Sequence, residues 1–116
     1  MTLTTQLSTH EDVRQIQLGG RLDSNTYGTL ENLLPTVFEQ EGALALMDCT
    51  ALDYVSSAGL RVILMAAKRA RQMQGRLVVF GLKPQVREVF EVSGFLKILN
   101  VADDMDSALQ SLKASA

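Results

Sequence analysis

The sequence predicts an α/β domain with a mostly parallel sheet of four or five strands, an N-terminal antiparallel hairpin and about four helices. Three observations support this prediction. Two segments with alternating apolar residues occupy the first twenty positions, separated by a polar turn. Apolar runs then alternate with stretches of helical periodicity, an order typical of parallel sheets with crossover helices. The 116 residues, 47% hydrophobic and 21% charged, suit a single domain over residues 1–116 with its core at about 3–112.

The hairpin is expected from residues 2–8 and 13–20. Residues His10–Asp12 between them are polar and are expected to form the turn. Apolar residues recur at every second position in both segments, most clearly at Leu3, Leu7, Ile16 and Leu18, with Thr5 in the same phase. A period of two gives each strand one buried face and one solvated face.

A helix is expected after Asp23 and Ser24, which are both favourable N-cap residue types. Its apolar face consists of residues at three- and four-residue intervals, namely Tyr27, Leu30, Leu34, Val37 and Phe38. Pro35 lies inside this pattern, where an interior proline costs about 3 kcal/mol. We therefore expect the helix to kink or to restart at Pro35, and to end at Gly42.

The middle of the chain predicts a buried strand followed by a long helix. Residues 43–48 form an unbroken apolar run that ends in an acid, as in a strand buried on both faces. A loop is expected over residues 49–56. The helix then begins near Ser57 and ends at Gly75, a residue type that suits the C′ position. Its expected core face consists of Leu60, Ile63, Leu64 and Ala67.

The next unit has the same strand–helix order. Residues 76–82 are expected to form another buried strand. Pro84 suits the first position of a helix, and Gly94 is expected to end it. The inward-facing residues of this helix are Val86, Val89 and Phe90.

The C-terminal part predicts one more strand and one more helix. Residues 96–101 form the last short apolar run. Asp103 and Asp104 are expected at the start of a terminal helix, and the final KASA, residues 113–116, is expected to be loosely ordered.

The most informative segment is LDYVSSAGLR, residues 52–61. Ser56 and Ser57 stand where the long helix begins, so either hydroxyl can serve as its N-cap. Ala58 and Gly59 are small and are expected to leave the first turn open to a partner. The fold would tolerate a phosphate here, because a helix N-terminus offers free amide donors and a partial positive charge. The residues alone allow two interpretations: serines that only cap the helix, or a phosphorylation switch.

Several motifs together resemble the STAS domain (sulfate transporter and anti-sigma factor antagonist). They are Gly20-Arg21-Leu22-Asp23, Asp48-Cys49-Thr50, the segment from Leu52 to Val62, the segment from Gly81 through Pro84 to Val89-Phe90, and Ser93-Gly94-Phe95. The resemblance covers nearly the whole chain. The chain is similar in particular to stand-alone antagonists that are phosphorylated by a serine-kinase anti-sigma factor.

The resemblance implies a non-enzymatic partner switch. The unphosphorylated antagonist binds the serine-kinase anti-sigma factor and releases its client. Phosphorylation breaks the complex, and a metal-dependent serine phosphatase resets it. Aligned on Gly59, the family pattern Asp-Ser-Ser-Gly puts Ser56 in place of the aspartate and Ala58 in place of the second serine, so Ser57 is the expected acceptor and Ser56 the alternative. The expected partner-binding residues are Asp23, Asp53, Tyr54, Val55, Ser56, Ser57, Ala58, Gly59, Arg61 and Met65.

The outer side of the long helix is locally basic. Its stripe opposite the expected core face consists of Arg61, Met65, Lys68 and Gln72, with Arg69 and Arg71 nearby. One interpretation is a solvated charged face. The other is that Arg61 and Met65 dock the kinase beside the phosphorylation site, since an exposed thioether adapts to varied surfaces.

Two other functions are considered. Ala58 keeps open a STAS scaffold, or a regulatory subunit of a sensory or transport complex, that is never phosphorylated. An enzyme using Ser57 would need a base, and the single histidine, His10, lies in a separate turn. Asp23, Asp48 and Asp53 have no histidine partner of the kind found around metal ligands. We therefore expect no catalytic residue, metal or cofactor.

Charge and hydropathy limit the partners further. A net charge of −2 argues against a general nucleic-acid binder. The apolar stretches are far shorter than the roughly 20 residues needed to cross a bilayer, and the N-terminus has no signal-peptide pattern. We expect a cytoplasmic protein, monomeric or weakly dimeric, that binds neither membrane nor nucleic acid. Cys49 is expected to be a buried, unreactive thiol.

Overall fold

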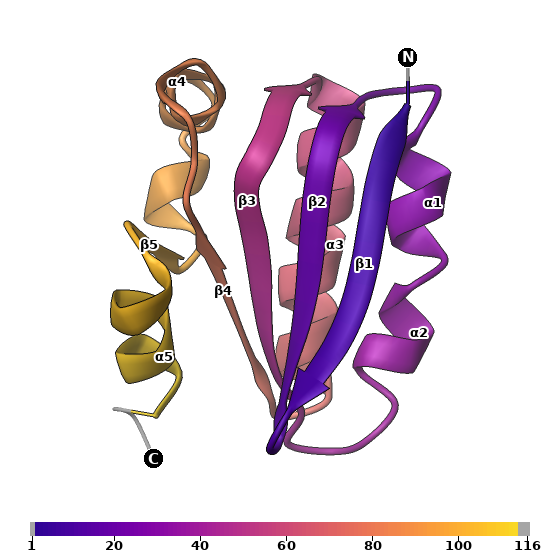
Figure 1. The fold of residues 1–116 in the computed structure, drawn as a ribbon, viewed down its shortest axis with the longest axis vertical. Helices are drawn as coiled ribbons and strands as arrows, with labels where there is room; N and C mark the ends of the chain where they lie inside the picture. Colours follow the sequence, from indigo (N-terminus) through magenta and orange to yellow (C-terminus); the bar gives the residue numbers. More distant parts are fainter. Residues whose placement is uncertain (1, 114–116) are drawn as a thin grey trace.

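A computed structural model describes residues 2–113 of the chain. Five strands form one sheet in the order β1-β2-β3-β4-β5 (Figure 1). β1 (Leu3–His10) and β2 (Val13–Leu22) are antiparallel, and β3 (Leu44–Val55), β4 (Arg76–Phe80) and β5 (Val101–Ala102) continue the sheet in parallel. The predicted fold class, with its N-terminal hairpin and mostly parallel sheet, is confirmed.

The helices cover the sheet unequally. The main core lies between one face of the sheet and four helices, α1 (Tyr27–Glu31), α2 (Leu34–Val37), α3 (Ser57–Gln72) and α4 (Pro84–Val92). A smaller core on the opposite face contains side chains of β2, β3 and β4 packed against α5 (Met105–Lys113). Successive residues of β4 alternate between the two cores, with Leu77 and Val79 in the first and Val78 and Phe80 in the second.

The hairpin turn is one residue shorter than expected. His10 pairs with Val13 and is the last residue of β1, so only Glu11 and Asp12 connect the strands. Glu11 has φ +57°, the left-handed conformation that two-residue hairpins require.

β3 differs most from its prediction. The sequence predicts a strand over residues 43–48 and a loop over 49–56, but the strand runs without interruption to Val55. The predicted loop is therefore wrong, and the long helix begins directly after the strand. Asp48 lies inside β3 and is not its polar end.

Two β-bulges explain why the extension of β3 is hard to see in the sequence. The pairing of β2 with β3 shifts between Gln17 and Gly19 and again between Gly20 and Arg21, where β3 supplies an extra residue each time. The bulges put residues with three-residue spacing on the buried face, namely Cys49, Leu52 and Val55. The period-two signature of a strand is lost there.

The first helical segment is interrupted and restarts at Pro35, which was one of the two predicted outcomes, the other being a kink. α1 ends at Glu31, and α2 begins at Leu34 with Pro35 in its first turn. The expected apolar face is buried except for Tyr27, which is exposed. The expected caps are wrong, because the N-cap of α1 is Thr26. Asp23 instead begins the turn that precedes α1.

α3 ends in a Schellman motif whose left-handed residue is Gln74, with φ +57°. Gly75 is therefore not at C′. It is the next residue, and its N–H donates to the Ala70 carbonyl at 2.7 Å. A Cβ at Gly75 would lie 2.0 Å from the Ala43 carbonyl oxygen, so the close approach of this backbone explains the glycine. The core face of α3 is Gly59, Leu60, Val62, Ile63, Ala66 and Ala70, with Leu64 and Ala67 half-buried at its border.

The predicted strand over residues 96–101 is also wrong. Gly94, with φ +76°, turns the chain into a short 3-10 helix η1 (Phe95–Lys97), and only Val101 and Ala102 pair with β4. Pro84 does begin α4, and the terminal helix follows Asp104, whose carboxylate accepts from the Ser107 N–H. Of the final KASA, Lys113 belongs to α5 and the rest lies outside the described residues.

Candidate functional site

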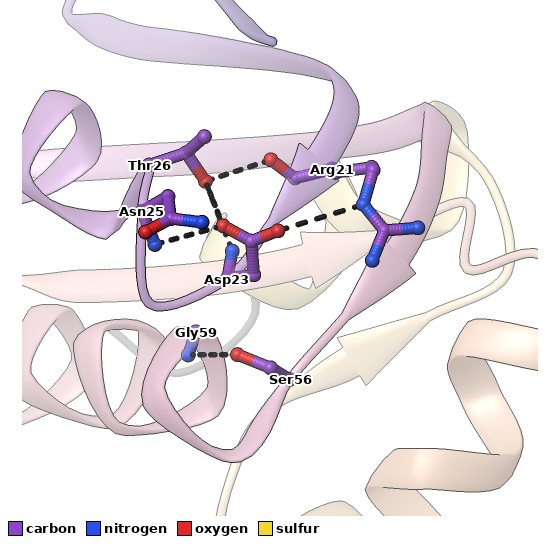
Figure 2. A network of polar contacts seen from close by, with 6 residues as sticks. All are labelled: Arg21, Asp23, Asn25, Thr26, Ser56 and Gly59. Carbon is purple, nitrogen blue, oxygen red and sulfur yellow. Dashed lines mark hydrogen bonds and ion pairs between the residues drawn. The ribbon is translucent and has the colours of Figure 1, made fainter. Parts of the chain in front are cut away.

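The candidate site lies where β2 and β3 reach their carboxyl ends and α3 begins (Figures 1 and 2). The Ser56 N–H donates to the Leu22 carbonyl at 2.9 Å, which ties the end of β3 to the end of β2. Open parallel sheets usually bind their ligands and partners at this edge. The segment around Ser56 and Ser57 lies at a strand end, as expected, although the chain reaches it as a strand and not as a loop.

Ser56 and Ser57 have different roles in the structure. Ser56 is the N-cap of α3, with extended backbone (φ −95°, ψ 176°), and its hydroxyl accepts from the Gly59 N–H at 3.2 Å (Figure 2). Ser57 is the first helical residue and is exposed. Among residues 2–113 its hydroxyl has no hydrogen-bond partner. The site therefore offers one serine that stabilises the helix and one that is free to react.

Two of the expected partner-binding residues do not reach the surface. Val55 is 2% exposed, and Gly59 is buried against the end of β2. A Cβ at Gly59 would lie 2.6 Å from the Leu22 carbonyl oxygen and 2.8 Å from its Cγ. Gly59 is thus required for the close packing of α3 on the sheet, and it does not leave the first turn open to a partner.

A polar network fixes the turn between β2 and α1 (Figure 2). The Asp23 carboxylate accepts from the Asn25 N–H at 2.9 Å and from the Thr26 hydroxyl at 3.3 Å, and it faces Arg21 Nε at 3.5 Å. The single hydrogen of the Thr26 hydroxyl is shared between this carboxylate and the closer Arg21 carbonyl oxygen, at 2.8 Å. The pKa of Asp23 is lowered, chiefly by the Asn25 backbone N–H, with further contributions from Thr26 and Arg21. Asp23 is therefore a structural anion beside the site.

Arg21 joins this network to the exposed end of β3. Its guanidinium lies 4.0 Å from the centroid of the Tyr54 ring, in the cation–π arrangement. Tyr54 keeps 39% of its surface exposed. Next to it, the exposed Asp53 forms an ion pair with Lys83 Nζ at 2.5 Å, which links β3 to the N-cap of α4. Rigid Tyr and Arg side chains at a surface are frequent energetic centres of protein interfaces.

The remaining expected residues lie on α3. Ala58 is half-buried in the first turn, and Arg61 and Met65 are exposed, Met65 to 44%. The expected residues whose side chains are exposed are therefore Asp53, Tyr54, Ser57, Arg61 and Met65. Arg21 and Lys83 are additions that the sequence prediction missed. In the sequence, Arg21 is singled out only as part of the motif Gly20-Arg21-Leu22-Asp23, which forms the end of β2.

The site has few groups suited to chemistry on a substrate. Within residues 2–113, no group of three or more His, Cys, Asp and Glu side chains could hold a metal ion. No helix in the same range is long and apolar enough to cross a membrane. Cys49 is buried, and burial raises the pKa of its thiol to about 12. What the structure shows is an exposed Ser57 hydroxyl at the start of α3.

Comparison with known proteins shows the family of the chain. A family model described as the STAS domain matches residues 4–108. A Bordetella bronchiseptica protein, BtrV, is 45% identical over 84% of this chain and 84% of its own length, and carries a provisional name as an anti-sigma factor antagonist. The anti-sigma-B factor antagonist of Listeria monocytogenes is 33% identical over 78% of this chain and 82% of its own.

A solved structure also has this fold. The anti-sigma factor antagonist of Mycobacterium paratuberculosis superposes with a TM-score of 0.86 and covers 97% of this chain and 95% of its own. Its sequence identity is 21%, so the likeness concerns the fold. The overall fold of this chain is therefore also found in an independently solved structure.

Proposed function

The chain belongs to the STAS domain family and, within it, to the anti-sigma factor antagonists, and we propose that it works as a phosphorylation-controlled partner switch. Its unphosphorylated form binds a serine-kinase anti-sigma factor, which then releases its client. The kinase phosphorylates Ser57, the complex dissociates, and a metal-dependent serine phosphatase restores the binding form. The chain itself is a substrate and a ligand, not an enzyme, and this role is performed in the cytoplasm.

The observation that supports this proposal is that the two serines differ in their contacts. A kinase needs a hydroxyl that is exposed and not engaged in the fold. Ser57 meets both conditions, whereas the Ser56 hydroxyl caps α3. Ser56 is the alternative acceptor, but its modification would remove a cap whose loss typically costs about 1 kcal/mol.

A phosphate on Ser57 would leave the fold intact. It would lie in the first turn of a 16-residue helix, where an anion is favoured by about 0.3–1 kcal/mol at an exposed position. Arg61 follows one turn later, at the i+4 spacing that lets opposite charges on a helix interact. The phosphorylated side chain therefore has local partners and needs no rearrangement of the domain.

The same phosphate would weaken a complex in which this edge is buried. It adds about 1.5–2 negative charges among Tyr54, Arg61 and Met65, and these charges must be desolvated when a partner covers them. Each 1.4 kcal/mol lost lowers the affinity about tenfold. The surface covered by the partner would include Asp53, Tyr54, Ser57, Ala58, Arg61 and Met65, with Asp23 holding Arg21 in place.

Incubation with ATP and the anti-sigma kinase encoded nearest to this protein tests the proposal. Intact and peptide mass spectrometry should show a single phosphoryl group on Ser57. Ser57→Ala should abolish the addition, whereas Ser8→Ala, which changes an exposed serine on β1, should not.

Binding of the two forms supplies the second part of this test. The unphosphorylated protein should bind the kinase, and the phosphorylated protein should bind at least tenfold more weakly. If an active kinase binds the chain with equal affinity in both states, or never modifies it, the chain is a STAS scaffold or regulatory subunit.

A further inference from the structure

Charge is strongly segregated along this chain. Residues 54–87 contain seven of the eleven Lys and Arg residues and none of the thirteen Asp and Glu residues. Four of the seven lie on α3, at Arg61, Lys68, Arg69 and Arg71, and all four are exposed. A helix in a protein with a net charge of −2 thus carries only positive charge.

The cations of α3 also differ in their surroundings from four of the cations elsewhere in the chain. Arg14, Arg21, Lys83 and Arg87 each form an ion pair with a carboxylate of the same chain. No carboxylate among residues 2–113 pairs with any of the four α3 cations. Favourable interaction with the helix dipole explains basic residues in the last turn, Arg69 and Arg71, but not Arg61 or Lys68.

Two of the four cations, Arg61 and Lys68, share one face of the helix with the proposed phosphorylation site. At about 100° per residue, Ser57, Arg61, Met65, Lys68 and Gln72 fall within an arc of roughly 80°. Arg69 and Arg71 lie on either side of this arc. Met65, 44% exposed, contributes an apolar contact in the middle of the charges. We call the surface formed by Arg61, Met65, Lys68, Arg69, Arg71 and Gln72 the cationic face of α3.

We propose that the cationic face of α3 is a docking surface for an acidic patch on the kinase. This inference rests on the proposed function and adds the chemistry of the partner. Unpaired cations around an apolar centre suit a protein surface with carboxylates around an apolar contact. The net charge of −2 and the small size of the cationic face favour such a partner over nucleic acid.

Phosphorylation then acts on the same surface. A phosphate on Ser57 offsets roughly half of the four positive charges of the cationic face. Its effect falls mainly on Arg61, one turn away. Lys68 lies eleven residues further along the helix, roughly 16 Å, which is about twice the Debye length at physiological ionic strength. A substitution at Lys68 therefore changes the docking surface without disturbing the surroundings of Ser57.

The test measures the rate and affinity of kinase binding for charge variants that lie far from Ser57. Lys68→Glu should weaken binding roughly tenfold, mainly through slower association, and should flatten its dependence on salt. Lys68→Arg should bind as the wild type does. Lys97→Glu is the matched control, because it reverses an exposed charge on η1 and should change the affinity less than twofold.

Three results would overturn the proposal. Equal effects of the Lys68 and Lys97 reversals would show that only net charge matters. Wild-type association independent of salt between 50 and 300 mM, roughly a twofold change in Debye length, would show that no charged docking occurs. Binding of a short DNA duplex at physiological salt, lost in the Lys68 variant, would assign the cationic face to nucleic acid. Phosphorylation of Ser57 is measured separately by mass spectrometry. A wild-type protein that the active kinase does not phosphorylate would refute the proposed function, not the docking surface.

Discussion

The two adjacent serines allow stability and signalling to be separated by single substitutions. Ser56→Ala removes the oxygen that accepts from the Gly59 N–H at 3.2 Å, and the loss of an N-cap typically costs about 1 kcal/mol. For a domain of this size that corresponds to a decrease of about 4 °C in Tm. Ser57→Ala removes a hydroxyl without a partner among residues 2–113, and exposed changes of this kind stay within about 0.5 kcal/mol.

The assay combines urea unfolding with phosphorylation of the same variants. Ser56→Ala should be less stable yet still be modified at Ser57, whereas Ser57→Ala should be as stable as the wild type and remain unmodified. Ser56→Asp is the matched control, because aspartate caps a helix as well as serine does and its charge favours the N-terminus. It should restore the stability that Ser56→Ala loses.

The opposite pattern would refute the reasoning. If Ser57→Ala destabilises the protein while Ser56→Ala does not, Ser57 is the cap and the free hydroxyl is Ser56. If Ser56→Ala loses phosphorylation while its fold stays intact, Ser56 is the acceptor.

Three more predictions concern the surroundings of the site. Gly59→Ala should destabilise the domain by about 1–3 kcal/mol in urea unfolding, because its Cβ would lie 2.6 Å from a carbonyl oxygen; Gly28→Ala on α1, with nothing within 4 Å, should be neutral or stabilising. The folded-state pKa of Asp23 is lowered, mainly by the Asn25 N–H, so its contribution is present above the unfolded pKa of about 3.9 and is lost as the pH falls through the folded value. Asp23→Asn should therefore lose less stability than the wild type between pH 6 and pH 3, and an equal loss would contradict the shift. The Cys49 thiol, with its pKa of about 12, should react with a disulfide reagent at pH 8 only as urea unfolds the protein, and rapid reaction of the native protein would contradict its burial.

Patterns of local sequence were enough to predict much of this protein. Alternation identified the hairpin, the position of Pro35 predicted either a kink or a restart in the first helical segment, and Ser57 marked the start of α3. These features depend on interactions among residues close together in the chain, where propensity and periodicity operate. Several short motifs between Gly20 and Phe95 together identified the family, because each of them is contiguous in the sequence.

Other predictions failed where a residue's environment depends on a distant strand. The extension of β3 to Val55 needs its pairing with β2, and the two bulges in that pairing replace the period of two. Position 59 needs a glycine because the Leu22 carbonyl, more than thirty residues earlier in the chain, leaves no room for a Cβ. The sequence alone had instead related this glycine to a partner. The sequence pattern shows that a glycine is present but not which backbone approaches it.

The sequence by itself determined the order of strands and helices, the family, and the pair of serines from which the acceptor is drawn. Only the tertiary structure decided which serine is free. Because β3 continues to Val55, Ser56 keeps an extended backbone, and its hydroxyl turns back to the Gly59 N–H while Ser57 enters the helix with its hydroxyl exposed. Tertiary packing likewise placed the Arg21 guanidinium over the Tyr54 ring and buried Val55. Both features depend on segments that are far apart in the chain. Residue type limits which groups can cap, pair or react, and the packing of distant segments determines which of them do.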